Sequence, residues 1–177
     1  EILEVLAFVK AFEIVKVAIV GANEALPVVN ELAKNNVSVV LYRLHNTPPN
    51  SEGEVDYAYT LPVKMKNAGV KFAFSYYGDM EAAHSRNLAY VAGTAANYGL
   101  TKEEALRAIT LTPAQILGID DKLGTLEAGK QASFVISEGD ILDMKTSKVQ
   151  SAYLKGEKID LMDKQKALNE KYLTKYK

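Results

Sequence analysis

The sequence predicts an α/β fold with a parallel sheet, followed by a shorter part built from β-strands. Three apolar, β-branched segments, at residues 15–21, 37–45 and 70–78, have the length and composition of buried strands. Segments with helical patterns separate them, and strand–helix alternation at this spacing predicts parallel βαβ units. Near residue 120 the pattern changes to short strands joined by glycine turns.

The helices between and after the strands have local start and stop signals. The pair Asn35–Asn36 ends a helix over 22–36, and Pro48–Pro49 makes 46–60 a loop, because proline neither donates a ladder hydrogen bond nor continues a helix. The remaining predicted helices cover 2–12, 61–69, 86–100 and 160–177, and the later short strands lie within 121–141 and 147–159.

Two helices carry capping signatures. Thr101, with Glu104 three residues on, forms a capping box for a helix over 101–109. For the next helix we expect Thr112 at the N-cap, Pro113 at the first helical position and Gly118 just past the end.

Composition excludes several classes of function. The 177 residues suit one domain, and a net charge of -1 gives no field that would recruit nucleic acid or an anionic membrane. No apolar run approaches the roughly 20 residues that span a bilayer. Without cysteine there is neither a disulfide nor a thiolate metal site. The opening "EILEVLAFVKAF" has the pattern of a helix interior, so we expect a piece of a longer chain.

The stretch "GLTKEEALRAITLTPAQILGIDDKLGTLEAGKQASFVI" (99–136) resembles the C-terminal signature of the amidohydrolase superfamily, with imidazolonepropionase-like and prolidase-like members the most similar. The resemblance implies the C-terminal part of a (β/α)8 TIM-type barrel, followed by part of a small β-sandwich and a C-terminal helix. The expected domains are 1–119 for the barrel half, 120–161 for the sandwich portion and 162–177 for the helical tail.

By the same resemblance, the three strands are the sixth, seventh and eighth of the barrel, whose sites lie at the carboxyl ends of the strands. The family's histidine ligand on the sixth strand falls on Gly21, and its aspartate on the eighth falls on Tyr77. Neither residue matches the family's ligand. We therefore expect no metal ligand and no cofactor in this chain, and a zinc-type divalent metal only in a longer parent protein.

Asp79, two residues after Tyr77, is the first catalytic candidate. A bend at Gly78 would bring it to the aspartate position as a general base or a substrate-orienting carboxylate. Alternatively it caps the following turn or pairs with Arg86 in solvent.

Arg43 and His45 lie at the end of the second predicted strand, and strand alternation predicts that both point to the same side. They would bind a polar or anionic substrate there, with His45 as a catalytic acid–base group and Asp79 as the partner of Arg43. The alternative is a hydrogen-bonded strap that fixes the loop around the two prolines.

His84 and Arg86 precede a helix whose N-terminus could hold a substrate carboxylate. The alternative is that Ser85 caps this helix and His84 is solvated. Tyr77, with Tyr76, would narrow the pocket or stack on a ligand, unless one of them only fills the space of a missing metal.

The resemblance implies metal-dependent hydrolysis of C–N bonds in amides, cyclic amides or dipeptides, with two ligand positions lost in this chain. The alternative is a catalytically inactive relative or fragment with this fold that only binds a ligand. The expected partners are a small-molecule substrate and, because three parallel strands leave unpaired edges, either the missing N-terminal half of the barrel or a second copy of the chain. Neither nucleic acid nor a membrane is expected.

Overall fold

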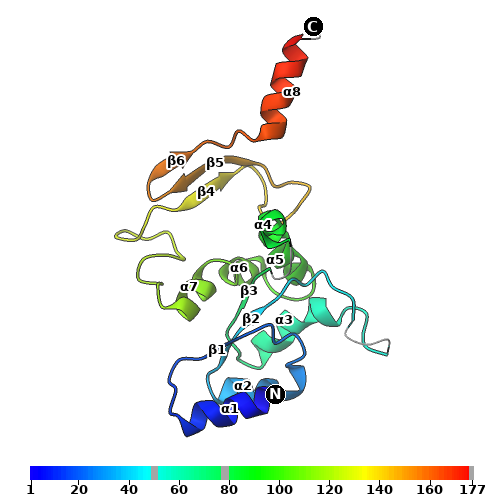
Figure 1. The fold of residues 1–177 in the computed structure, drawn as a ribbon, viewed down its shortest axis with the longest axis vertical. Coiled ribbons are helices and arrows are strands. Elements are labelled where there is room, and N and C mark those ends of the chain that lie inside the picture. Colours follow the sequence, from blue (N-terminus) through cyan, green and yellow to red (C-terminus); the bar gives the residue numbers. More distant parts are fainter. Residues whose placement is uncertain (49–51, 77–79, 176–177) are drawn as a thin grey trace.

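The computed structural model describes residues 1–48, 52–76 and 80–175 of the chain. Two three-stranded sheets organise it (Figure 1). The described helices and strands are α1 Ile2–Ala11, β1 Ala18–Val20, a 3-10 turn Leu26–Val28, α2 Val29–Lys34, β2 Ser38–Leu41, α3 Tyr57–Asn67, β3 Phe72–Phe74, α4 Glu81–His84, a 3-10 turn Ser85–Asn87, α5 Leu88–Asn97, α6 Lys102–Arg107, α7 Leu111–Leu117, β4 Phe134–Ser137, β5 Val149–Leu154, β6 Glu157–Ile159 and α8 Lys164–Lys175.

The first sheet is parallel, in the order β1-β2-β3, as predicted. β2 is the central strand, and its Val39 and Leu41 are fully buried. Helix α3 contributes the buried Leu61 and Met65 to the same core. The sheet is open: the described strands form part of an α/β architecture and do not close into a barrel.

The predicted strands were too long. The structure gives β1 three residues and ends β2 at Leu41, because the ladder between neighbouring strands covers only these short registers. The prediction that the first strand is covered on both faces is wrong, since Ala18 and Val20, which share one face of β1, are exposed. The far edge of β3 is partly covered, because the Phe74 amide donates to the Ala108 carbonyl at 3.2 Å.

The capping box was predicted correctly. The Thr101 hydroxyl accepts from the Glu104 amide at 3.2 Å, and the Glu104 carboxylate accepts from the Thr101 amide at 2.8 Å. Gly118 ends α7 in the left-handed conformation, also as predicted. The N-cap of α7 was placed wrongly: it is Thr110, and Pro113 is the third helical residue, where a missing N–H costs no intrahelical bond.

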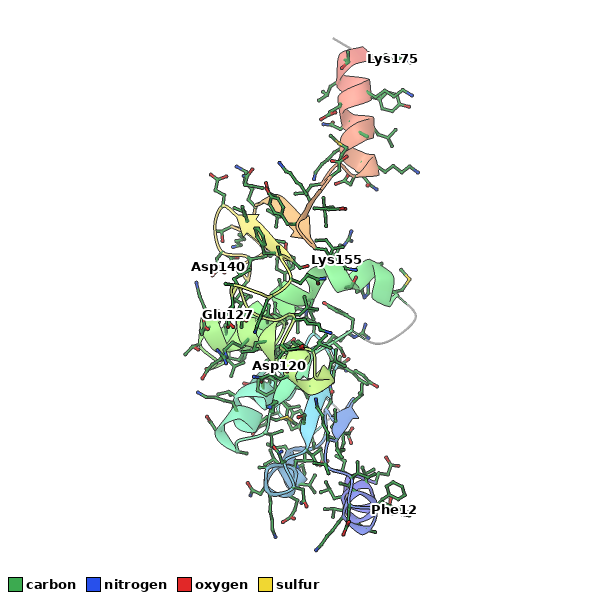
Figure 2. The ribbon with its side chains drawn as sticks, turned by 90° about the vertical axis from the view of Figure 1, so that its left-hand side faces the viewer. Phe12, Asp120, Glu127, Asp140, Lys155 and Lys175 are labelled. Carbon is green, nitrogen blue, oxygen red and sulfur yellow. The ribbon has the colours of Figure 1, made fainter. Side chains whose placement is uncertain are left out.

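The second sheet is antiparallel, in the order β4-β5-β6, and lies at the end of the molecule opposite α1 (Figure 1). Phe134 on β4 stacks on Tyr153 on β5, with ring centroids 4.8 Å apart. Beyond this sheet α8 projects from the body, so Phe12 and Lys175 lie near opposite ends of the molecule (Figure 2). Among the described helices, none is long and apolar enough to cross a membrane.

Candidate functional site

The carboxyl ends of the three parallel strands meet at one edge of the sheet, which is where open α/β sheets bind ligands. Backbone pairing continues one residue past the strands: the Gly21 amide donates to the Val40 carbonyl at 2.8 Å, and the Ser75 amide donates to the Leu41 carbonyl at 2.8 Å. The residues that follow are therefore held close to the sheet.

Arg43, Tyr76 and His84 are associated at this edge. Burial raises the pKa of the Tyr76 phenol, and the positive charge of Arg43 opposes that rise. The Tyr76 and His84 rings meet edge to face, with centroids 6.1 Å apart. Arg43 is half-buried, and it forms no salt bridge with any residue in the described ranges. A cation in this position suits an anionic group of a ligand.

His45 lies in a different environment. Because β2 ends at Leu41, strand alternation does not extend to residues 43–45. His45 Nε2 is 2.8 Å from the Thr94 hydroxyl on α5, and Thr94 itself donates to the Tyr90 carbonyl at 3.0 Å. A hydroxyl has one proton, so Nε2 must donate to Thr94. This bond joins the loop after β2 to α5, as the strap interpretation expects; a catalytic role for His45 stays a prediction.

The remaining sequence candidates divide between described and undescribed residues. His84 ends α4, and Arg86 is exposed in the following 3-10 turn. The N-cap of α5 is Asn87, so the expectation that Ser85 caps this helix is wrong. Tyr77 and Asp79 lie outside the described residues, and their predicted roles in binding and catalysis stay predictions.

Tyr42 is a strand-end residue that the sequence reasoning missed. Gly21 has φ +84°, and a Cβ built there would lie 2.5 Å from the Tyr42 Cζ and 2.7 Å from its hydroxyl oxygen. The tip of the phenol therefore covers residue 21. Asn23 fixes the turn after β1. Its backbone amide donates to the Gly21 carbonyl at 2.7 Å, and its side-chain Oδ1 accepts from the Tyr42 backbone amide at 3.2 Å.

The described residues at the strand ends do not fit a metal centre. A catalytic zinc needs about three protein ligands, and no group of three or more His, Cys, Asp or Glu side chains among the described residues could hold a metal ion. At the end of β1, Gly21 has no side chain, and the space a side chain would need is filled by the Tyr42 ring.

Two cavities are not lined by Arg43, Tyr76 or His84, but His45 lies in the wall of the second. One, of about 680 Å³, separates α6 and α7 from the antiparallel sheet and is mostly apolar, with Leu106, Leu126 and Phe134 in its wall. The other, of about 560 Å³, lies between α5 and the loop after β4. Its wall includes the ion pair Lys102–Asp140, with 2.6 Å between Nζ and Oδ2.

Comparisons with known proteins agree on one family. The model described as "Amidohydrolase family" matches residues 2–164. An imidazolonepropionase of Shewanella oneidensis is 54% identical over 39 residues, which are 22% of this chain and 10% of that protein.

Among solved structures, an amidohydrolase from Thermotoga maritima MSB8 aligns with a TM-score of 0.77 at 28% identity, covering 90% of this chain and 40% of its own. An adenosine deaminase from Xanthomonas campestris, solved with bound zinc, aligns with a TM-score of 0.57 at 21% identity, covering 97% of this chain and 45% of its own. The chain thus spans less than half of each of these two solved structures.

Proposed function

Because this chain belongs to the amidohydrolase family, we propose that it supplies the substrate-binding edge of a protein that hydrolyses C–N bonds in amides, cyclic amides or dipeptides. The observation that supports this most directly is the group Arg43, Tyr76 and His84 at the carboxyl ends of the parallel strands. In this proposal β1, β2 and β3 are the sixth, seventh and eighth strands of a barrel, and the antiparallel sheet is part of a small sandwich.

The ligand in this proposal is a small amide that carries a carboxylate. Arg43 would bind the carboxylate, since a guanidinium offers paired donors to two oxygens at once. Tyr76 and His84 would pack against the body of the ligand, since their rings already meet edge to face. Tyr77, Asp79 and Arg86 remain proposed contacts of the same ligand, and His45 a proposed acid–base group.

No hydrolytic step is assigned to a metal held by these residues. If the protein hydrolyses amides with a metal, ligands from other residues must hold it. A second candidate function is ligand binding without turnover. It is favoured by the lack of space for a metal-ligating side chain at Gly21, where the Tyr42 ring lies.

Binding of N-acetylglycine, measured by titration calorimetry, tests the proposed site. We expect Arg43→Gln to weaken binding by about 10- to 100-fold, the range for losing a hydrogen bond to a charged group. Arg107→Gln is the matched control, because it removes the same charge from an exposed residue on α6. Arg107 Nη1 lies 3.9 Å from Glu103 Oε1. Equal affinities of the wild type and Arg43→Gln would overturn the proposed site.

Turnover and metal content separate the two candidate functions. Glycine released from N-acetylglycine, together with about one equivalent of a divalent metal in the purified protein, would support the hydrolase. Binding that depends on Arg43, with neither turnover nor metal, would support the binding protein.

We further propose that another strand covers the free edge of β1, from more chain of the same protein or from a second copy. Unpaired edges favour association, and Val20 on this edge is 59% exposed. The molar mass of the isolated chain in solution, measured by light scattering at high protein concentration, tests this proposal. A monomer that does not aggregate would contradict it.

A further inference from the structure

We infer that Tyr42 fills the space of a side chain at the end of β1, so that a metal-ligating side chain does not fit there. The starting point is the disagreement between the family resemblance, which places a histidine ligand at residue 21, and the geometry around Gly21. The inference rests on the proposed function in one respect, the choice of the strand ends as the site.

Backbone conformation is the first reason. Gly21 has φ +84°, in the left-handed region that residues with a Cβ rarely adopt. The turn is held by hydrogen bonds on both sides of the residue, from the Gly21 amide to Val40 and from the Asn23 amide to the Gly21 carbonyl. A side chain at residue 21 would therefore strain a well-anchored turn.

Occupied space is the second, independent reason. The nearest atoms to a Cβ at residue 21 are Cε2 and Cζ of Tyr42, both at 2.5 Å, and its hydroxyl oxygen at 2.7 Å. Contacts under 3.0 Å are essentially never made by real Cβ atoms. The Asn23 side chain accepts from the Tyr42 amide at 3.2 Å, which fixes the backbone of Tyr42, so a Cβ at residue 21 would require the ring to turn away. The phenol tip thus lies over the end of β1.

The chemical consequence concerns which groups the strand ends present. Tyr42 is half-buried and directly precedes Arg43. A phenol offers one O–H donor and an aromatic surface, whereas a neutral imidazole would offer a lone pair to a metal. The end of β1 therefore has a phenol ring over it, at a position where a coordinating side chain does not fit.

The chain contains no cysteine, which allows a direct test with Gly21→Cys. Gly156→Cys is the matched control, because Gly156 has φ +85° and a Cβ built there would meet nothing within 4 Å. We expect a maleimide to label the Gly21→Cys thiol at least about tenfold more slowly than the Gly156→Cys thiol, since a covered thiol reacts poorly. Adding Tyr42→Ala should accelerate labelling at residue 21 and leave labelling at residue 156 unchanged.

Thermal unfolding of the two alanine variants gives a second readout. Gly156→Ala should lower Tm by about 2–8 °C, the cost of a left-handed non-glycine residue. Gly21→Ala should lower Tm by roughly 5 °C more, because the ring adds overpacking. That extra loss should shrink when Tyr42→Ala is also present.

Slow labelling relieved by Tyr42→Ala, together with the extra loss of Tm, supports the inference. Equal labelling of the two thiols, or equal Tm losses in the two alanine variants, overturns it. Neither assay uses a ligand, so the inference can fail while the Arg43-dependent binding of N-acetylglycine stands, and the reverse.

Discussion

Gly93→Ala should destabilise the protein although alanine is the better helix former. Gly93 is buried in α5, and a Cβ there would overlap the carbonyl oxygen of Leu142 and lie 3.0 Å from its carbonyl carbon. The loop that carries Leu142 cannot simply retreat. Leu142 is 8% exposed within the core, and Asp140 accepts from its amide at 2.9 Å while pairing with Lys102.

The change in the free energy of unfolding caused by Gly93→Ala is the sum of one favourable and two unfavourable contributions. Replacing glycine by alanine inside a helix gains about 1 kcal/mol of propensity. Overpacking a tight contact costs about 1–3 kcal/mol, and a partial withdrawal of Leu142 adds part of the roughly 2–5 kcal/mol that complete truncation of a buried leucine costs. We expect a net loss of about 1–3 kcal/mol, equivalent to a fall in Tm of about 2–10 °C for a chain of this size.

Urea unfolding followed by circular dichroism measures this loss, and a double-mutant cycle identifies its cause. Asp140→Ala frees the loop, so Gly93→Ala should cost less in that background than in the wild type. A Gly93→Ala variant as stable as the wild type, or losses that simply add, would refute the close contact between α5 and this loop.

Three further predictions concern the core and the capped helix. Thr101→Ala should lower the free energy of unfolding by about 1 kcal/mol through loss of the N-cap, measured by urea unfolding, and a neutral result would deny the cap a role. The Lys66 ammonium and the Thr101 amide hold the pKa of Glu104 at about 2, below its ordinary 4.5; because the folded pKa is the lower one, this stabilisation is present above about pH 4.5 and is lost as the pH falls toward 2. Tm should therefore fall less over that window in Glu104→Gln than in the wild type, and parallel Tm–pH curves would contradict the assignment. Met65→Ala should cost about 2–5 kcal/mol, because Met65 is fully buried; a loss below about 1 kcal/mol in urea would mean that the site collapses around the smaller side chain.

Local signals allowed much of the fold to be predicted. The capping box at Thr101 involves residues three apart, and Gly118 adopts the αL conformation that glycine tolerates, so both follow from a short sequence window. The parallel arrangement of the first sheet followed from the alternation of its strands with helices. The match of residues 2–164 to the amidohydrolase family confirms the resemblance found in residues 99–136.

Predictions that depended on neighbouring elements were less accurate. The apolar run at 15–21 indicated a strand covered on both faces, yet Ala18 and Val20 on one face of β1 are exposed, because no described element covers that face. Arg43 and His45 alternate in sequence, but a strand that ends at Leu41 cannot impose alternation beyond itself. His45 instead finds its hydrogen-bond partner 49 residues away, on α5.

The strand-end site shows most clearly where sequence reasoning fails. A family signature is carried by glycines, a proline and caps that build the scaffold, and these can persist while the side chains at the strand ends change. Gly21 alone says only that no side chain stands at this position. That the place is filled follows from Tyr42, which is adjacent only because β1 and β2 pair in parallel with Val20 opposite Val40. The register that aligns the two strands thus also brings the phenol over Gly21, and a change in that register would reopen the position.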